Sequence, residues 1–398
     1  MAWEKVKLGE VAEITSSKRI FANQYVDKGI PFYRQKEIIE RNNKQDVSEP
    51  LFISQDLYED IKKKYGVPCE GDLLITGVGV TLGIPYVVGK EIFYFKDGNL
   101  IWLKNFSQEV NSKFIYYYIN SDVGQKAMWS RTIGAAQPAL TIDLVKQYEI
   151  PKPPLATQQK IADILSAYDN LIENNQKQIK LLEEAAQRLY KQWFIDLRFP
   201  GHETTKIVDG LPEGWKKEKL VDLADVQFGY AFDGSLFNSN GIGTPIVRIR
   251  NIPDGITNDY TTENAPEEYL IENGDIVVGM DGEFHINSWS GEISYLVQRS
   301  CCFKPHNPKM KGWLLWAIHD PIKFFEKTVV GATVAHLGKK HIDTIELLTG
   351  PEKLYETFQN LFCKRQTLLN QNRKLAESRD RLLPKLMNNQ MEDYCDKK

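Results

Sequence analysis

Two long segments of the chain place apolar residues at alternating spacings of four and three positions. The first series runs from Ile161 to Trp193 and the second from Phe358 to Leu386. This spacing is that of an a/d heptad seam, which is typical of a helix that packs along its whole length against another helix. Each segment has about 33–38 residues, or roughly 50–57 Å at a rise of 1.5 Å per residue.

The two seams share a polar position near their middle. Asn175 occupies it in the first segment and Asn372 in the second. A polar residue in a seam lowers stability but determines register, and the midpoints of an antiparallel pair meet. We therefore expect an antiparallel helix pair in which the two asparagine side chains are in reach of each other. Arg365 and Arg379 interrupt the second seam, and Pro384 predicts an end or a kink.

The segments that precede the two long helices are similar to each other in sequence. Four blocks recur in the same order, which indicates a tandem duplication of a unit of domain size. The paired blocks are WEKVKLGEVAEI (3–14) with WKKEKLVDLADV (215–226), GIPFYRQKEI (29–38) with GTPIVRIRNI (243–252), GDLLITGVG (71–79) with GDIVVGMDG (274–282), and IGAAQPALTIDLVKQYEI (133–150) with VGATVAHLGKKHIDTIEL (330–347).

Each copy reads as a mixture of strands and helices. The Gly-Asp blocks predict a turn followed by a buried strand, and residues 110–128 and 311–327 have helical periodicity, with their aromatic residues in the core. The predicted fold is therefore α+β, with two similar α/β modules and two long antiparallel helices in a pseudo-two-fold arrangement. The expected segments are module 1 (residues 1–152), a first long helix (153–194), a linker (195–212), module 2 (213–349), a second long helix (350–390) and a tail (391–398).

The prolines of PKPPLATQQKIADIL (151–165) mark the exit from module 1. Proline disfavours helix in the residue before it, so we expect the module to end there. Thr157 is the expected N-cap of the first long helix. Pro351 is expected in the first turn of the second.

Charge is distributed unevenly along a chain whose net charge is −3. Residues 1–152 hold 20 Lys and Arg against 19 Asp and Glu, whereas residues 195–350 hold 15 against 22. Neither module is basic as a whole, so an anion-binding surface would have to be a local cluster. The five cysteines form no C-x-x-C pair, and no run of about 18 apolar residues is present. We expect a cytoplasmic protein without a membrane-spanning helix or a metal site.

Seven segments together resemble the specificity subunit of type I restriction-modification systems, and the resemblance covers essentially the whole chain. They are SSKRIF (16–21), GIPFYRQKEI (29–38), GDLLITGVGVTLG (71–83), GAAQPAL (134–140) followed by IPKPPLATQQKIADIL (150–165), QWFIDLRFPG (192–201), LPEGWK (211–216) and RDRLLPKLM (379–387). The resemblance implies that the two modules are target-recognition domains for the halves of a bipartite, asymmetric site in double-stranded DNA.

The resemblance also implies a non-catalytic chain with catalytic partners. Members of that family dock two methyltransferase subunits on the helices, and restriction-translocase subunits join them. S-adenosylmethionine, ATP and Mg are then expected in the partner subunits, with no cofactor in this chain.

The residues themselves show no catalytic motif. The segment from Gly83 to Lys90 has the wrong spacing for a phosphate loop, and Leu82 stands where a dinucleotide fingerprint needs its third glycine. Two other functions stay open: a structural coiled-coil scaffold without DNA reading, and the recognition half of a fused restriction-methylation enzyme.

Candidate DNA contacts are residues of DNA-binding type at matching positions of the two copies. Arg and Lys favour guanine and phosphate, and Asn and Gln favour adenine. Arg34 with Lys36, and Arg248 with Arg250, are expected to alternate along a short strand and share a face; a solvated or ion-paired face is the alternative. Gly77 and Gly79 would allow close approach of backbone to phosphate, whereas Asp281 would repel it. The full set of candidates is Lys18, Arg19, Arg34, Lys36, Thr76, Arg131, Gln137, Arg248, Arg250, Arg299, His336, Lys339 and Lys340.

Overall fold

The computed structural model describes residues 3–43, 45, 47–132, 138–328 and 335–387, and it divides into two compact units. Unit 1 comprises residues 1–170 and 376–398, and unit 2 comprises residues 171–375. Helices α7 (Leu155–Tyr190) and α12 (Lys353–Met387) each contribute to both units. The predicted tail and parts of the repeated Gly-Ala blocks lie outside the described residues.

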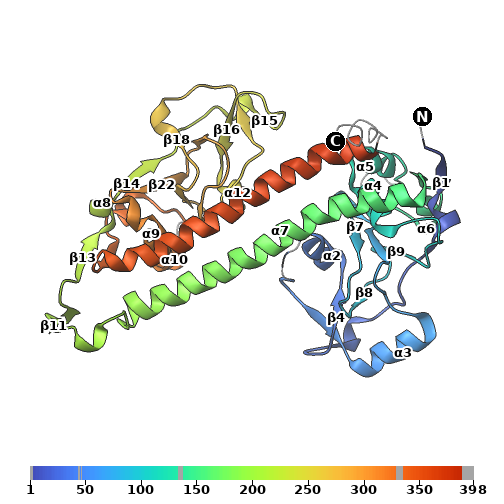
Figure 1. Cartoon of the computed structure of the whole chain (residues 1–398), viewed down its shortest axis with the longest axis horizontal. Coiled ribbons are helices and arrows are strands. Elements are labelled where there is room, and N and C mark those ends of the chain that lie inside the picture. Colours follow the sequence, from blue (N-terminus) through green and yellow to red (C-terminus); the bar gives the residue numbers. More distant parts are fainter. Residues whose placement is uncertain (1–2, 44, 46, 133–137, 329–334, 388–398) are drawn as a thin grey trace. The chain divides into compact units, whose positions relative to one another are not determined.

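Module 1 is built from two four-stranded sheets and a closing strand pair (Figure 1). The sheet orders are β2-β9-β6-β7 and β3-β5-β4-β8, and β1 pairs with β10. The strands are β1 (Lys5–Lys7), β2 (Glu13–Thr15), β3 (Tyr25–Val26), β4 (Ile30–Tyr33), β5 (Leu51–Ile53), β6 (Leu73–Thr76), β7 (Pro85–Val87), β8 (Tyr94–Phe95), β9 (Leu100–Lys104) and β10 (Glu149–Pro151). The helices are α1 (Leu8–Val11), α2 (Gln35–Asn42), α3 (Gln55–Tyr65), α4 (Ser112–Asn120), α5 (Asp122–Trp129) and α6 (Ile142–Lys146), with 3-10 turns η1 (Ala22–Gln24) and η2 (Gly79–Thr81).

Module 2 repeats this plan, as the duplicated blocks predict. Its sheets have the orders β14-β22-β19-β20 and β15-β17-β16-β21-β18, and β13 pairs with β23. The strands are β13 (Lys216–Lys219), β14 (Ala224–Phe228), β15 (Phe237–Asn238), β16 (Thr244–Val247), β17 (Tyr260–Thr261), β18 (Leu270–Ile271), β19 (Ile276–Gly279), β20 (Ile286–Ser288), β21 (Ser294–Leu296), β22 (Ser300–Pro305) and β23 (Glu346–Thr349). The helices are α8 (Leu220–Leu223), α9 (Lys311–Ala317), α10 (His319–Thr328) and α11 (Lys339–Ile342), with 3-10 turns η5 (Gly234–Leu236), η6 (Ile249–Asn251), η7 (Glu267–Tyr269) and η8 (Pro308–Met310).

The expected linker (195–212) contains regular structure. It includes the end of a π-helical turn, η3 (Lys191–Ile195), which follows α7. A 3-10 turn, η4 (His202–Thr204), and a two-stranded hairpin of β11 (Ile207–Val208) and β12 (Leu211–Pro212) come next.

The Gly-Asp dipeptides begin the central strand of each module, which confirms the predicted turn and buried strand. Gly71 and Gly274 have φ angles of 91° and 90°, a region in which a residue with a Cβ is strained. The carboxylates of Asp72 and Asp275 each accept a hydrogen bond from the amide three residues earlier, at 2.9 and 3.0 Å. Strands β6 and β19 follow and are buried throughout.

The segments with helical periodicity each form two helices. Residues 110–128 become α4 and α5, because Ser121 ends one helix and its hydroxyl accepts a hydrogen bond from the Gly124 amide at the start of the next. Residues 311–327 become α9 and α10. The expected burial of the aromatic residues is confirmed for Phe114 and Trp313, but Phe324 is exposed.

Helix α7 begins at Leu155, before the predicted N-cap residue Thr157. Thr157 lies inside its first turn, where its amide donates to the Pro154 carbonyl at 2.8 Å, so the predicted N-cap role is wrong. At the start of this helix, the buried side-chain amide of Gln158 donates a hydrogen bond to the Pro153 carbonyl at 2.8 Å. Helix α12 begins at Lys353, after Pro351, so the predicted place of Pro351 in its first turn is also wrong. Despite their length, neither α7 nor α12, nor any other helix in the described part of the chain, is apolar enough to cross a bilayer.

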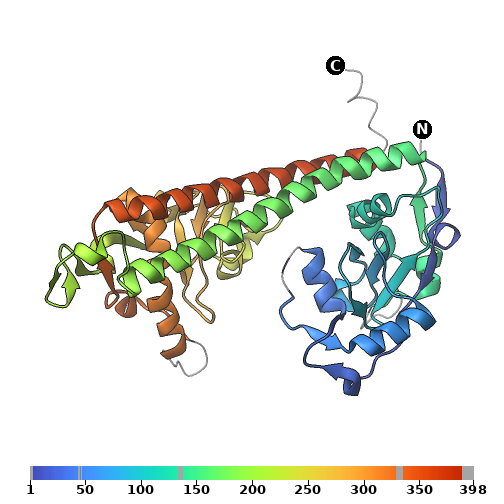
Figure 2. The same ribbon diagram turned by 60° about the horizontal axis from the view of Figure 1, so that its bottom comes forward.

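In unit 2, residues 171–190 of α7 and 353–375 of α12 lie side by side and run in opposite directions (Figures 1 and 2). The Asn175 Nδ2 donates to Asn372 Oδ1 at 2.9 Å, so the expected contact is present. Eight residues further along α7, Glu183 meets Arg365 at 2.6 Å. Arg365, which interrupts the apolar pattern of the seam, is therefore one of its contact residues.

In unit 1, the same two helices meet through a second ion pair. Asp169 of α7 contacts Arg379 of α12 at 2.7 Å, and the Tyr117 hydroxyl donates to the same carboxylate at 2.5 Å. Burial and the neighbouring Asp169 both raise the pKa of Tyr117. The helix does not end at Pro384, because α12 continues to Met387, and Leu386 and Met387 are buried.

The asparagine pair supports a test of register by a double-mutant cycle. We expect Asn175→Leu and Asn372→Leu each to lower the free energy of unfolding by about 1–2 kcal/mol, because each leaves one amide half-buried without its partner. The double variant should recover most of this loss, since two apolar residues then face each other. Urea-induced unfolding of the complete chain measures all three, and additive losses would contradict the proposed pairing role.

Candidate nucleic-acid interface

The first predicted basic pair of module 1 lies at a helix start, not on a strand. Strand β4 ends at Tyr33, and Arg34 is the N-cap of α2. The fully buried Glu37 accepts hydrogen bonds from the Arg34 backbone amide at 2.7 Å and from its guanidinium. The prediction of an alternating strand is therefore wrong. The strand ends before Arg34, and the Glu37 carboxylate accepts the hydrogen bond of the Arg34 amide at the start of helix α2. The side-chain hydrogen bond to Glu37 raises the pKa of Arg34.

Lys36 follows in α2 and is also ion-paired. Its Nζ lies 3.2 Å from a Glu49 carboxylate oxygen, and Arg34 lies 3.6 Å from the same oxygen. The ion-paired alternative that the sequence left open is therefore the one observed for both residues.

The equivalent pair in module 2 also follows a strand end, but it lies at a 3-10 turn in place of an α-helix. Strand β16 ends at Val247, and Arg248 is the N-cap of η6, with its amide 2.8 Å from the Asn251 side-chain oxygen. Arg250 contacts Asp259 at 2.5 Å. Partial burial opposes ionisation of Asp259, but hydrogen bonds from Arg250 and Asn251 hold the pKa of its carboxyl below the ordinary value. The Arg248 guanidinium lies over the Phe237 ring at 5.5 Å.

The glycine-rich loop of module 1 uses its polar groups internally. Thr76 is the last residue of β6 and is fully buried, and its hydroxyl donates to the Thr81 carbonyl at 2.5 Å and accepts from the Ile84 amide at 2.9 Å. The Thr76 side chain is therefore not accessible to DNA in this conformation. The amides of Gly77 and Gly79 donate to carbonyls of the same module, at 2.8 and 2.9 Å, and are not directed at an external phosphate.

Two other candidates of module 1 lie on one loop, and a third lies near the Gly-Ala block. Arg19 contacts Asp97 at 2.7 Å, and the Lys18 ammonium lies 5.3 Å from the centre of the Tyr65 ring. The Arg131 guanidinium lies 5.9 Å from the centre of the Tyr148 ring, and its Nε is buried without a hydrogen-bond partner in the described structure. Gln137 lies outside the described residues.

Module 2 brings two of its candidates onto one carboxylate. Asp281 accepts a hydrogen bond from Arg299 Nη1 at 2.9 Å through one oxygen, and its other oxygen lies 2.5 Å from His336 Nδ1. The predicted role of Asp281, repelling phosphate, overlooks that it orients these two side chains.

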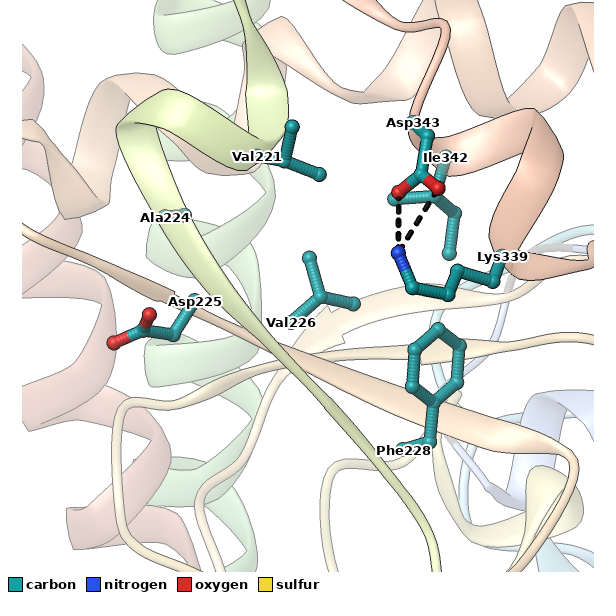
Figure 3. Close-up of a pocket in the computed structure, with 8 residues that line it drawn as sticks. All are labelled: Val221, Ala224, Asp225, Val226, Phe228, Lys339, Ile342 and Asp343. Carbon is teal, nitrogen blue, oxygen red and sulfur yellow. Dashed lines mark hydrogen bonds and ion pairs between the residues drawn. The ribbon is translucent and has the colours of Figure 1, made fainter.

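Lys339 and Lys340 begin helix α11 beside a small cavity of about 180 Å³. Figure 3 shows the Lys339 ammonium directed at Asp343, with both carboxylate oxygens at 2.9 Å. Lys340 is exposed. Burial, together with the charges of Lys340 and His336, lowers the pKa of the neighbouring His341.

Sequence reasoning found the cations but missed the acids that hold them. Glu37 could have been recognised from its position three residues after Arg34, a spacing at which side chains meet on a helix. The acids that pair with Arg19, Arg250 and Arg299 belong to other segments and leave no local signal. Within the described residues, no group of three or more His, Cys, Asp and Glu side chains could hold a metal ion.

Comparison with known sequences gives one family for both modules. The family described as "Type I restriction modification DNA specificity domain" matches residues 2–184 and 212–351. The chain is 26% identical over 296 residues to the type I restriction enzyme MjaIX specificity subunit of Methanocaldococcus jannaschii, covering 70% of this chain and 68% of that protein. It is 24% identical to the putative MjaX specificity subunit of the same organism, over 97% of this chain and 92% of that one.

A solved structure supports the fold. The crystal structure of the type I restriction-modification system S subunit from M. genitalium aligns with a TM-score of 0.60 at 16% identity, over 97% of this chain and 96% of that one. At this identity the likeness concerns the fold alone.

Proposed function

Because this chain belongs to the family of type I restriction-modification DNA specificity subunits, we propose that it selects the DNA sequence on which a multisubunit complex acts. Each module would read one half of a bipartite, asymmetric site in double-stranded DNA. The helices α7 and α12 would dock two methyltransferase subunits, and restriction-translocase subunits would join these. The chain itself would perform no catalysis.

The observation that carries this proposal is the duplicated plan with different local structure at matching basic positions. The two modules share strand orders, apart from the additional strand β18 of module 2, and the start of their central strand. Yet Arg34 is the N-cap of helix α2, which contains Lys36, whereas Arg248 is the N-cap of a short 3-10 turn that contains Arg250. A repeated framework that presents its donors on different local structures is what recognition of two different half-sites requires.

Charge supports a role for partners in binding. Module 1 and the long helices are close to neutral, and residues 195–350 have seven more acidic than basic residues. Non-specific DNA affinity comes mainly from cations on phosphates, so this chain alone has little of it. Partner subunits would supply the remaining phosphate contacts, and also S-adenosylmethionine, ATP and Mg for adenine methylation and DNA cleavage.

The test is to map methylated adenines in a host that carries this chain with its methyltransferase subunits and no other adenine methyltransferase. We expect one asymmetric motif of two half-sites separated by a spacer of constant length. Replacing module 2 by that of a relative should change one half-site and leave the other unchanged. Methylation of the same motif without this chain, or a motif that survives the replacement, would favour a scaffold over a DNA reader.

A further inference from the structure

The two modules build the same backbone junction where the loop after the central strand meets two other segments. In each module, this loop forms an antiparallel bridge with the segment that precedes the last short helix, α6 in module 1 and α11 in module 2. The loop donates one backbone hydrogen bond to that segment and accepts another from it. In module 1 the contacts are the bridge Val78–Ala139 and the hydrogen bonds Gly77 N to Asn99 O (2.8 Å), Gly79 N to Pro138 O (2.9 Å) and Leu140 N to Gly77 O (2.8 Å). In module 2 they are the bridge Asp281–His336 and the hydrogen bonds Met280 N to Arg299 O (2.8 Å), Gly282 N to Ala335 O (3.1 Å) and Leu337 N to Met280 O (2.7 Å).

These contacts show which side chains are equivalent. Val78, Asn99 and Ala139 in module 1 correspond to Asp281, Arg299 and His336 in module 2. The same junction therefore forms with no charged side chain at any of the three positions. Folding of the junction does not explain the charged group in module 2.

The three side chains of module 2 are arranged around the carboxylate. Asp281 is only 17% exposed, whereas Arg299 is 69% exposed and His336 is 57% exposed. Within the described residues, the one hydrogen bond of the Arg299 side chain is from Nη1 to Asp281. Its other donors lie on an exposed guanidinium whose direction the carboxylate restricts.

The backbone of Arg299 is strained. Its φ is 68°, in the left-handed region that residues other than glycine, asparagine and aspartate rarely adopt. The Arg299 carbonyl accepts a hydrogen bond from the Met280 amide at 2.8 Å. A strained, non-glycine residue that persists at an exposed position is a reason to look for a function that needs its side chain there.

We propose that Arg299 is a specificity-determining residue that recognises a guanine in the major groove, with Asp281 and His336 as its positioning residues. Guanine presents two acceptors, O6 and N7, to which an arginine fork donates two hydrogen bonds. A phosphate contact fits less well, because Asp281 offsets the charge of Arg299 and would repel a phosphate. The inference rests on the proposed function, since it names the base that module 2 reads.

The experiment uses the complex with its methyltransferase subunits and a plasmid library randomised over the half-site of module 2. We expect Arg299→Ala to lower discrimination at one G·C pair by about 10- to 100-fold, as for loss of one bidentate contact. Arg299→Lys keeps the charge but loses the fork, so it should also relax that pair. Every other position, including the half-site of module 1, should keep its preference.

Two further variants separate recognition from folding. Arg299→Gly relieves the backbone strain, so we expect its melting temperature to equal or exceed that of the unaltered chain while discrimination is lost. Asp281→Asn should relax the same base pair and no other. The control is Lys309→Ala, which removes an exposed ion pair with Glu352 in the same unit and should leave the motif unchanged.

Three results would overturn the inference. One is a motif retained at full stringency in Arg299→Ala, and another is methylation that falls equally for all sequences, which would indicate a phosphate contact. The third is a lower melting temperature in Arg299→Gly, which would indicate a structural role. If the unaltered complex yields no bipartite motif, the proposed function itself fails, which is a separate outcome.

Discussion

Replacing Arg365 by alanine is expected to lower the free energy of unfolding of unit 2 by about 3 kcal/mol, because alanine removes a buried side chain and its three hydrogen bonds. The Arg365 side chain is only 9% exposed, and all three of its nitrogen types are used. Nε donates to Glu183 at 2.6 Å, Nη1 to Ser288 at 2.6 Å and Nη2 to Asn287 at 2.7 Å. Alanine would leave the buried Ser288 hydroxyl without this donor and Glu183 without its ion-pair partner, while Asn287 Oδ1 would keep only the hydrogen bond from the Ser288 amide. It would also open a cavity between α12 and β20.

Urea-induced unfolding of the complete chain, followed by tryptophan fluorescence, measures this loss. The control is Arg381→Ala, an exposed arginine of the same helix, which should change stability by less than about 0.5 kcal/mol. The double variant Arg365→Met with Glu183→Gln should recover part of the loss. Glutamine at position 183 removes the unpaired charge, and methionine at position 365 fills the space that arginine occupied. A loss below about 1 kcal/mol for Arg365→Ala would show that water replaces the arginine in this network.

The second large effect is expected for Gly312→Ala in α9. A Cβ at this position would lie 2.3 Å from the carbonyl oxygen and 2.6 Å from the carbonyl carbon of Phe358 in α12. Backbone atoms cannot rotate away, so the two helices must separate. We expect a loss of about 3 kcal/mol, the upper part of the usual range for overpacking.

The sign of this effect is informative, since alanine is a better helix former than glycine by about 1 kcal/mol. If α9 could move without cost, Gly312→Ala would therefore stabilise the chain. Gly234→Ala is the matched control, because a Cβ there meets no atom within 4 Å. Chemical denaturation of both variants checks the prediction, and a gain in stability for Gly312→Ala would show that the close approach of α9 and α12 is not required.

The architecture was predictable because it depends on periodic patterns. The heptad spacing located both long helices, and the two asparagines located their contact. The repeated blocks predicted two modules of one plan, and the sheet orders agree apart from the additional strand β18 of module 2. Such patterns extend over many residues, so a single exception such as Pro384 does not remove them. Of the two outcomes expected at Pro384, an end or a kink, the end is wrong.

The candidate site was harder to predict because its geometry depends on single contacts. Arg34 and Lys36 are expected on a strand, but the buried Glu37 carboxylate accepts a hydrogen bond from the Arg34 amide and a helix begins there. Threonine is a residue type that often contacts phosphate, but Thr76 is buried at the end of β6. This burial results from packing of the sheet, which the local sequence does not show. Arg19 and Asp97 are 78 residues apart, and no spacing rule connects them.

The closing strand pairs have a consequence for how such a chain can change over generations. Strand β1 pairs with β10, and β13 pairs with β23, so the chain enters and leaves each module at neighbouring points. A long helix begins a few residues after each exit. Recombination between related genes at these two borders would therefore exchange a whole recognition unit without moving the helix that follows it, and new DNA specificities could arise by reassortment of intact halves.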